Sequence, residues 1–342
     1  MSITVTNPHD GPRSADAPDF SLRPLRVPDD YPRLAAVLNA SATADGLDWA
    51  NTAADVANYL NSPFPCDPAR DVVVAEVDGD VVGYGRAWWR TLEDGTMLYI
   101  SSNYVAPAGR GGELRRTMLH RTEARLRQIA AEHPAGQPKL YQVFTDLNVA
   151  DLAAVLTAEG YAPVRYAYKM VRPTLDDIPD FPLPDGLETR PVRPEQIRAI
   201  LEADVEAFRG MWGFSKPTEA DLQAYINDPH CFQPEMWQIA WDTATNAIAG
   251  QVKAFINRAE NEKYNRRRGY TEDICVAHPY RRRGLARALI VRSLRQQREM
   301  RMTESALGVD ADNEEALRVY LDCGFRVVRR SAWFRKEVTS FE

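Results

Sequence analysis

Cysteine, histidine and long apolar runs are all scarce in this sequence. The 342 residues include four cysteines and five histidines. The cysteines lie far apart, without the spacing of a zinc site or a disulfide framework; they are Cys66, Cys231, Cys275 and Cys323. No apolar run approaches the length of a membrane span. We therefore expect no metal, no membrane partner and a reducing, cytoplasmic environment.

An excess of positive charge is also lacking. The formal net charge is −6 at pH 7 and the pI is about 5.6, whereas a protein that binds nucleic acid usually has a basic face. We therefore expect no nucleic-acid partner, and a neutral or cationic substrate fits this charge better. Hydrophobic residues at 44% and charged residues at 26% are typical of globular proteins, and the length favours two domains.

Two segments are poor candidates for regular structure. Residues 1–19 are rich in Pro, Asp, Ser and Gly and lack the apolar stretch of a signal peptide, which predicts a disordered tail. Residues 173–186 hold four prolines and cannot continue a helix or a central strand. We therefore place a linker at 173–186, between one domain at 20–172 and another at 187–342.

The two domains repeat the same landmarks. An Arg-Pro pair begins at Arg23 and again at Arg190, 167 residues later. A Gly followed by an aromatic residue occurs at Gly160 and again at Gly324, 164 residues later. Solenoid repeats are several times shorter than this period. The sequence therefore indicates a duplicated domain.

Strand and helix signals are mixed within each copy. In the first copy, Asp29 or Asp30 can cap a helix that follows the first strand. Asp78-Gly79 lies between two apolar runs and is typical of a hairpin turn. A further strand is expected at 97–105 and a helix at 112–131. These signals predict an α+β fold.

The stretch from Ile274 to Ile290 combines an apolar strand, a basic turn and a helix. The turn reads Arg281-Arg282-Arg283-Gly284 and ends where the helix is expected to begin. N–H groups in the first turn of a helix have no intrahelical partner and can bind phosphate oxygens, and a glycine lets the ligand come close. The pattern predicts an anion-binding cradle. A solvated basic turn is the plainer alternative.

A second pattern lies further along the chain, after a strand expected at 306–309. It consists of Asn313, Ala316, Tyr320 and Gly324-Phe325. Together with the Arg-x-x-Gly-x-Ala of the cradle, it resembles the GNAT superfamily of acyl-CoA-dependent N-acyltransferases. The resemblance covers both copies as fold and the second copy alone as motif. It implies two tandem GNAT-like domains, each a splayed, mixed and mostly antiparallel sheet flanked by helices, in a layout similar to that of the mycothiol synthases.

The resemblance also implies roles for single residues. The pyrophosphate of CoA would be held by the turn and the helix start, at Arg281, Arg282, Arg283, Gly284, Leu285 and Ala286. Ile274 and Val276 would pair with the pantetheine like a neighbouring strand, and Asn313 would contact the cofactor arm. Tyr320 would lie near the thioester sulfur, where a phenol of pKa about 10 can protonate the departing thiolate. Ordinary core packing is the alternative for Tyr320.

N-acylation needs a base, because an amine of pKa about 10.4 is almost wholly protonated at neutral pH. Side chains alternate along a strand, so counting back by twos from Val276 defines one face; it holds Ile274, Glu272 and Tyr270. We expect Glu272 to be the base, directly or through water. Asp273 is held in reserve, because a β-bulge would exchange the two carboxylates. A carboxylate paired with a neighbouring arginine is the alternative.

The residues that bind the acceptor are less clearly marked. In the GNAT fold the first two helices and their loop usually shape the acceptor pocket. In this sequence that region holds Glu206, Arg209, Trp212 and Phe214, and Tyr270 lies on the predicted face of the base. Aromatic rings and a carboxylate could hold an amine. Plain core packing is an equally good interpretation of the aromatic residues.

The first copy has lost most of the motif. In an alignment on Val105, Arg110 keeps the place of Arg281, but Glu113 replaces the glycine and Arg115 the alanine. A carboxylate there repels the pyrophosphate. The positions of the base, the asparagine and the tyrosine hold Ser101, Val149 and Leu156. We expect no catalysis in this copy, although a one-residue shift at Gly112 could preserve some CoA binding.

These observations favour an enzyme whose second domain transfers an acyl group, most simply acetyl, from acetyl-CoA to a primary amine of a small molecule. Modification of an antibiotic such as an aminoglycoside belongs to the same class. Acetylation of protein lysines or N-termini is an alternative that needs an open groove. An acyl-CoA-binding sensor is a second alternative, against which Glu272 and Tyr320 count. A monomer and a homodimer are both compatible with the sequence.

Overall fold

The computed structural model describes residues 20–61, 65–110 and 113–338. The expected tail at 1–19 and the glycine at 112 lie outside these ranges. The first copy of the fold contains β1 (Ser21–Pro24), α1 (Tyr31–Ala44), α2 (Ala53–Leu60), α3 (Pro68–Asp71), β2 (Val72–Val77), β3 (Asp80–Thr91), β4 (Met97–Val105), the 3-10 turn η1 (Pro107–Gly109), α4 (Glu113–Glu132), β5 (Lys139–Asp146), α5 (Ala150–Ala158) and β6 (Ala162–Arg172).

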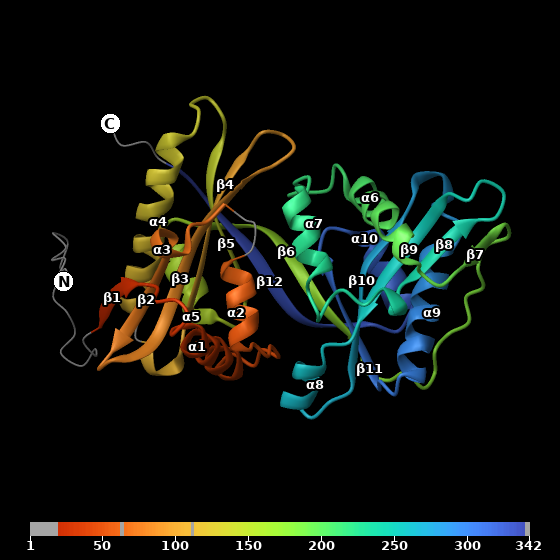
Figure 1. Ribbon diagram of the computed structural model, residues 1–342, viewed down its shortest axis with the longest axis horizontal. Helices are drawn as coiled ribbons and strands as arrows, with labels where there is room; N and C mark the ends of the chain where they lie inside the picture. Colours follow the sequence, from red (N-terminus) through yellow and green to blue (C-terminus); the bar gives the residue numbers. More distant parts are fainter. Residues whose placement is uncertain (1–19, 62–64, 111–112, 339–342) are drawn as a thin grey trace.

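The second copy follows the same order of elements. It contains β7 (Leu187–Thr189), η2 (Pro194–Gln196), α6 (Ile197–Phe208), α7 (Glu219–Ile226), η3 (Pro234–Met236), β8 (Gln238–Asp242), β9 (Ile248–Phe255), α8 (Arg258–Lys263), β10 (Arg268–Val276), η4 (His278–Tyr280), α9 (Leu285–Glu299), β11 (Glu304–Asp310), α10 (Glu314–Asp322) and β12 (Arg326–Glu337). The predicted α+β class is confirmed (Figure 1). We call the two copies the first half and the second half.

Two of the local expectations had different outcomes. Asp78 and Gly79 form the hairpin turn between β2 and β3, with φ angles of 51° and 86° that suit a tight turn. Asp30 precedes α1 but its carboxylate makes no capping bond to the helix. It accepts hydrogen bonds from the guanidinium of Arg23 and the N–H of Arg26 instead. Its charge is used to hold β1 against the start of α1.

All the strands form one sheet in the order β1-β2-β3-β4-β5-β12-β6-β11-β10-β9-β8-β7. Two pairs of neighbours are parallel and pair over only part of their length. β4 and β5 pair from Met97 to Ile100, and β10 and β11 pair from Arg268 to Tyr270. Beyond these points the strands diverge. Each half therefore contains a splayed gap, as the family resemblance implies.

The closing strands of the two halves are exchanged. β6 ends the first half in sequence but pairs with β11 of the second half. β12 ends the second half but pairs with β5 of the first half, and the two exchanged strands pair with each other. Figure 1 shows β6 and β12 crossing between the halves. The ranges 20–172 and 187–342 thus divide the chain, while the sheet continues through both.

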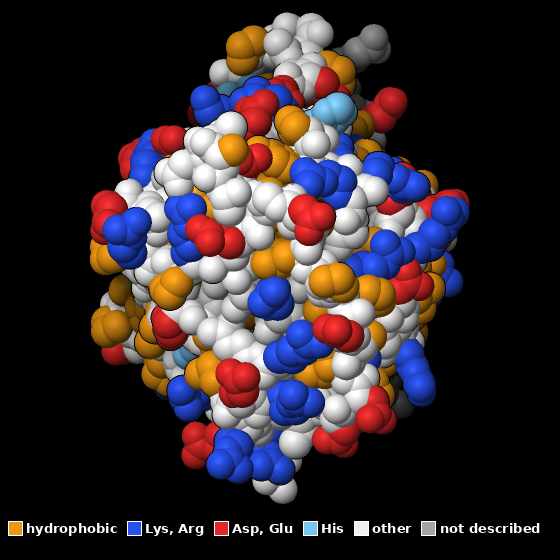
Figure 2. All heavy atoms as spheres, turned by 90° about the vertical axis from the view of Figure 1, so that its right-hand side faces the viewer, with side chains coloured by type: hydrophobic (Ala, Val, Ile, Leu, Met, Phe, Trp, Pro, Cys, Tyr) orange, Lys and Arg blue, Asp and Glu red, His pale blue; other side chains and the backbone are white. Residues whose placement is uncertain are grey.

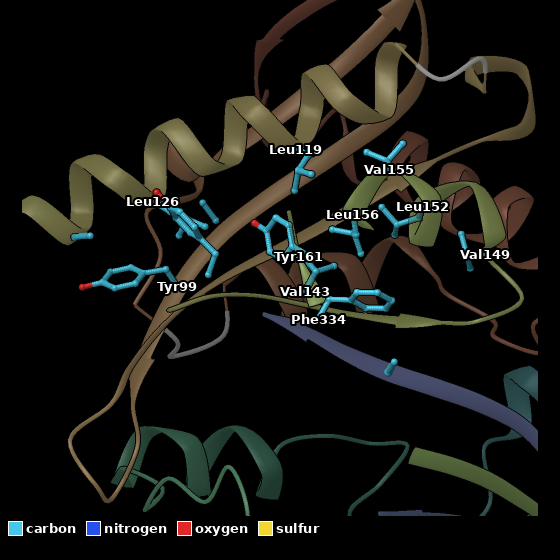
Figure 3. Close-up of a cluster of buried hydrophobic side chains, with 14 of the residues drawn as sticks. Tyr99, Leu119, Leu126, Val143, Val149, Leu152, Val155, Leu156, Tyr161 and Phe334 are labelled. Carbon is cyan, nitrogen blue, oxygen red and sulfur yellow. The ribbon is translucent and has the colours of Figure 1, made fainter. Parts of the chain in front are cut away.

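The exchange is built into the two hydrophobic cores. Phe334 of β12 is buried in the core of the first half, next to Leu156 and Tyr161 (Figure 3). Met170 of β6 is buried in the core of the second half, together with Leu307. Burial of a side chain of this size contributes about 1.5–3 kcal/mol. Each half therefore depends on a strand supplied by the other.

Helices cover both faces of the sheet in each half. In the first half, Val74 packs with α1 and α2, whereas its neighbour Ala75 packs with α4 on the opposite face. In the second half, Ile239 packs with α6, and Ala240 packs with α9 on the other side. Successive strand residues point to opposite faces. The splayed gap between β10 and β11 consequently opens toward α6 on one face and toward α9 on the other.

Candidate active site

The basic turn before α9 has the backbone of an anion cradle. Gly284 is the N-cap residue of the helix with a φ of 84°, in the left-handed region that glycine favours. The first helical hydrogen bond joins the N–H of Ala288 to the carbonyl of Gly284 at 3.1 Å. The N–H groups before Ala288 belong to the first turn and have no intrahelical acceptor. No heavy atom lies within 4 Å of a Cβ placed on Gly284, so a ligand has room there.

The three arginines of this turn are held differently. Arg281 donates its Nε to the carbonyl of Val276 at 3.0 Å, which ties the turn to the end of β10. Arg282 forms an exposed ion pair with Glu315 at 3.0 Å. Arg283 donates to the carbonyl of Asp185 at 2.9 Å. The turn therefore presents positive charge around an open helix N-terminus. Figure 2 views this half end-on, where basic and acidic side chains are interspersed.

A β-bulge interrupts β10 between Glu272 and Cys275. Asp273 has a φ of 47°, which is unusual for a residue other than glycine. Because of this bulge, Ile274 and Val276 pack into the core under α9, whereas Tyr270 and Glu272 line a cavity on the other face. The expectation that all four share one face is wrong, since the extra residue reverses the alternation.

Glu272 reaches across the splayed gap. Its Oε1 accepts a hydrogen bond from the N–H of Gly308 on β11 at 3.0 Å, beyond the last backbone pair of the two strands. Burial raises the pKa of this carboxyl to about 8, and the negative charge of Asp273 adds to the effect. The Gly308 N–H and the Lys169 ammonium act in the opposite direction. Glu272 is therefore a carboxyl that can exchange a proton near neutral pH.

Asp273, the reserve candidate, is tied into an ion-pair cluster. Its Oδ2 lies 3.1 Å from the Nζ of Lys253, which is buried and also 2.8 Å from Asp204 of α6. The bulge therefore separates the two neighbouring carboxylates. Glu272 has no ion-pair partner among the described residues, and Asp273 has one.

Tyr320 lies on α10, in the core on the α9 side of the sheet. Its side chain is 7% exposed, and its ring meets Phe325 edge to face with centroids 6.4 Å apart. Burial raises the pKa of this phenol above its ordinary value, and the nearby charge of Glu272 adds to the rise. The phenol therefore stays protonated at neutral pH. Asn313 caps α10, since its side chain accepts from the N–H of Ala316 at 3.1 Å.

A cavity of about 470 Å³ lies on the face of Glu272 and is enclosed by both halves. From the second half it is lined by Tyr270, Glu272, Leu307 and Gly308. The exchanged strands contribute Ala167, Tyr168, Lys169, Arg329 and Ser331. The first half contributes Ser41, Asp45, Leu47, Trp49, Ser102, Asn103, Tyr104, Arg115, Val143, Phe144, Thr145, Asp146, Val149 and Leu152. The carboxyl of Glu272 therefore faces an enclosed space of small-molecule size.

Comparison with known families places this geometry. Residues 197–325 match the model of the Acetyltransferase (GNAT) family. These residues contain the cradle, the splayed gap, Glu272 and Tyr320. The second half of the chain is a GNAT domain.

Curated relatives include mycothiol acetyltransferases. The protein of that name from Salinispora arenicola is 27% identical over 304 residues, which are 86% of this chain and 91% of the relative. The one from Pseudarthrobacter chlorophenolicus is 31% identical over 180 residues, 52% of this chain. In that second case the matched region spans about half, 53%, of the relative's length. The likeness is thus closer but shorter in one relative, and longer but weaker in the other.

Solved structures match both halves at once. A GCN5-related N-acetyltransferase from Sphaerobacter thermophilus has a TM-score of 0.72 and 26% identity, over 94% of this chain and 96% of that one. A tandem GNAT protein from the clavulanic acid biosynthesis pathway has a TM-score of 0.64 and 16% identity, over 95% and 100%. The second likeness concerns the fold alone. The tandem GNAT architecture is confirmed.

The residues predicted to bind the acceptor have other contacts. Trp212 packs on Trp333, with ring centroids 5.2 Å apart, and lies under the guanidinium of Arg335. Arg209 pairs with Glu206 and with Glu93 of the first half. The carbonyl of Phe214 accepts the N–H of Glu93 at 3.3 Å. The cavity is lined by Tyr270 but by none of Glu206, Arg209, Trp212 and Phe214, which instead join the GNAT domain to the first half.

Two charged residues near the GNAT base were missed by sequence reasoning. Lys169 of β6 lies opposite Gly308 in the sheet register and lines the cavity. Asp48, in the loop after α1, pairs with Lys169 at 2.7 Å and also with Arg266, Arg268 and Arg329. Both belong to the first half in sequence. A local pattern could not indicate them, because they reach the base only through the strand exchange.

Two further searches bear on the expected partners. No group of three or more His, Cys, Asp or Glu side chains is positioned to hold a metal among the described residues. Within the same ranges, no helix is both long and apolar enough to cross a membrane.

Proposed function

We propose that this protein transfers an acetyl group from acetyl-CoA to the primary amine of a small molecule, with the second half as the catalytic domain. The observation that carries the proposal is the position of Glu272. Its carboxyl bridges the splayed gap to Gly308 and also faces the enclosed cavity. A base must lie between the thioester and the acceptor, and this is where the two approaches meet.

The cradle would hold the pyrophosphate of CoA. Three features support this role: the open N-terminus of α9, the left-handed Gly284, and the positive charge of the arginines around the turn. Charge-assisted hydrogen bonds to phosphate contribute roughly 1.5–3 kcal/mol each. The pantetheine would then run along Ile274 and Val276, with Asn313 close to the cofactor arm. These assignments follow from the GNAT resemblance.

The chemistry divides between the two faces of the sheet. On the cavity face, the ionised carboxylate of Glu272 removes a proton from the acceptor ammonium, directly or through water. The free amine attacks the thioester carbonyl and forms a tetrahedral intermediate. The C–S bond then breaks, and the electron pair leaves on sulfur. On the α10 face, Tyr320 gives its phenolic proton to that thiolate, so that an amide and free CoA are released.

The cavity supports a small-molecule acceptor over a protein. Its lining comes from both halves and from the exchanged strands, which enclose the space on several sides. An extended peptide needs an open groove instead. The curated relatives named mycothiol acetyltransferases are consistent with a small amine as acceptor, so a mycothiol precursor belongs in any first screen. A cytoplasmic location and a monomeric or dimeric state remain predictions.

Thiol release gives a direct test. The native protein is incubated with acetyl-CoA and a panel of small amines, and free CoA is followed with a thiol reagent. Amine-dependent release is expected. Glu272→Gln and Tyr320→Phe should each reduce kcat by about 10²–10⁴-fold, the range for loss of a general acid or base.

Two results of this test separate the alternatives. Binding of acetyl-CoA without amine-dependent release would favour an acyl-CoA sensor. Release with histone-type peptides but with none of the small amines would favour a protein acetyltransferase.

A further inference from the structure

The first half contains a slot equivalent to the one proposed to hold the pantetheine in the second half. β4 and β5 diverge there as β10 and β11 do. Arg110 occupies the position of Arg281, and both arginines donate Nε to the last valine of the preceding strand. The distances are 3.3 Å to the carbonyl of Val105 and 3.0 Å to that of Val276. The framework of the slot is thus the same in both halves.

The end of this slot where a pyrophosphate would lie is closed. Arg110 donates to both carboxylate oxygens of Asp45, at 2.7 and 2.6 Å, and to the Oγ of Ser41 at 3.1 Å. Asn148 adds a bond to the carbonyl of Asp45 at 3.4 Å. The side chain of Asp45 is 5% exposed. In the second half, by contrast, Arg281 is exposed. The arginine of the first half therefore joins the end of α1 to the turn and seals the slot.

The other end of the slot opens into the cavity that contains Glu272. Six of the cavity-lining residues come from the elements that border the first half's gap: Ser102, Asn103, Arg115, Thr145, Val149 and Leu152. Figure 3 shows Val149 and Leu152 on α5, at the side of the first half's core. The cavity is therefore continuous from the base in the second half to the slot in the first.

One buried donor in this slot lacks a partner. Arg115 occupies the place of Ala286, is 2% exposed and donates its Nε to Asp151 at 2.5 Å. Its Nη2 is buried and makes no hydrogen bond to any described residue. A buried N–H without an acceptor is destabilising, so such groups usually meet a ligand or water oxygen.

The charges along the cavity are already compensated. Asp45 pairs with Arg110, Asp146 with Arg329 at 2.7 Å, and Lys169 with Asp48. A ligand group with its own net charge would disturb one of these pairs. The remaining lining offers aromatic rings, hydroxyls and amides, which include Trp49, Tyr104, Ser102, Asn103 and Thr145. This lining suits an uncharged group rich in hydroxyls.

We propose that the first half's slot is the distal subsite for the acceptor, where it binds an uncharged, hydroxyl-rich group attached to the reacting amine. The proposal rests on the proposed function for the position of that amine at Glu272. It assigns the slot to the acceptor in place of a second CoA. One chain then binds a single CoA, and the first half contributes to acceptor specificity.

Calorimetry tests the assignment without turnover. CoA should bind the native protein with one site per chain, and Gly284→Glu should abolish that binding. 2-Aminoethyl β-D-glucopyranoside should bind the CoA-loaded protein at least tenfold more tightly than ethanolamine, which has the same amine arm but no sugar. Its glucuronide analogue, which carries a carboxylate, should bind more weakly than the glucoside.

Two variants locate the subsite. Arg115→Met removes the unpaired donor, and Val149→Phe narrows the slot; each should lower the preference for the glucoside over ethanolamine by about tenfold. Ala150→Phe places the same ring one residue further on, at an exposed position of α5, and should keep the preference. A second CoA site that survives Gly284→Glu, or an equal affinity for glucoside and ethanolamine, would overturn the proposal.

The outcomes also separate this inference from the proposed function. Selective glucoside binding without thiol release supports the subsite and contradicts acetyl transfer to this class of amine. Thiol release that is equally efficient with ethanolamine and the glucoside supports the transferase and contradicts the subsite. Because the binding measurements need no catalysis and the CoA stoichiometry needs no variant, the proposal stays testable if a substituted protein fails to fold.

Discussion

The N–H of Gly308 donates to the Oε1 of Glu272 at 3.0 Å, across the gap where β10 and β11 no longer pair. The backbone bond that a continuous sheet would make at this place is replaced by a side chain. The carboxyl is held in the opening between the two faces of the sheet. This one contact orients the proposed base, and Gly308 leaves room for it because its missing side chain would lie 3.9 Å from the carboxylate.

The pH dependence of activity should follow Glu272. The pKa of its carboxyl is raised to about 8, and the base must be ionised to accept a proton. We expect kcat/KM to rise about tenfold per pH unit below pH 8 and to level off above it. Initial rates from pH 6 to 10 at low acceptor concentration measure this limb. A limb that is unchanged in Glu272→Gln would assign the titration to another group.

The stability of the protein should show the same carboxyl with the opposite sign. The pKa of Glu272 is higher in the folded state than in an unfolded chain, so the folded form is favoured while the group is protonated. This contribution is fully present below about pH 4.3 and is lost as the pH rises through about 8. Glu272→Gln should therefore raise the Tm by a few degrees at pH 9 and leave it unchanged at pH 4. Scanning calorimetry at the two pH values compares the variant with the native chain.

Removal of the Lys169 ammonium should weaken the proposed base near neutral pH. The positive charge of Lys169 lowers the pKa of Glu272, whereas burial and Asp273 raise it. In Lys169→Met the acidic limb of kcat/KM should move to higher pH, with a loss of about three- to tenfold at pH 7 and little loss at pH 9.5. Lys216→Met, at an exposed position, is the matched control. An equal loss at both pH values would point to a structural role instead.

CoA affinity should depend on the space and charge at residue 284. Gly284→Glu copies Glu113 of the first half and places a carboxylate where the pyrophosphate would lie. We expect a loss of about 10–100-fold in affinity, equivalent to one or two charge-assisted hydrogen bonds. Gly284→Ala carries the same left-handed strain without the charge, so the difference between the two variants isolates repulsion. Equal affinities in a calorimetric titration would contradict the cradle.

The strand exchange predicts that core substitutions act on the opposite half. Met170 lies in the first half by sequence but in the core of the second, and Phe334 has the reverse arrangement. Met170→Ala should cost about 2–5 kcal/mol and Phe334→Ala about 3–5 kcal/mol. Hydrogen exchange is expected to accelerate in α9 and α10 for the first variant, and in α4 and α5 for the second. Faster exchange confined to the half that carries the substitution in sequence would contradict the exchange.

Much of this architecture was predicted from local patterns. The turn at Asp78-Gly79, the order of elements in each half and the cradle at Gly284 all follow from a few neighbouring residues, whose conformational preferences act over one turn or one strand. The repeated landmarks predicted the duplication. Residues close in sequence carry these features, so the surrounding structure did not have to be known.

The positions of side chains around the site needed the tertiary structure. The bulge at Asp273 reversed the alternation of β10, so the face assigned to Ile274 was wrong and that assigned to Glu272 was kept. Trp212 resembled a pocket residue by composition, yet it packs on Trp333 of an exchanged strand. A one-residue register shift and a long-range contact leave no local trace in the sequence.

By itself the sequence determined a duplicated α+β fold and the chemistry available in the second half, because residue types and short spacings decide helices, turns and candidate acids and bases. The tertiary structure alone decided that β6 and β12 change places, that Lys169 and Asp48 reach Glu272, and that one cavity spans both halves. Strand pairing joins residues more than a hundred positions apart. Such pairing depends on the fit of whole cores, which no short stretch of sequence encodes.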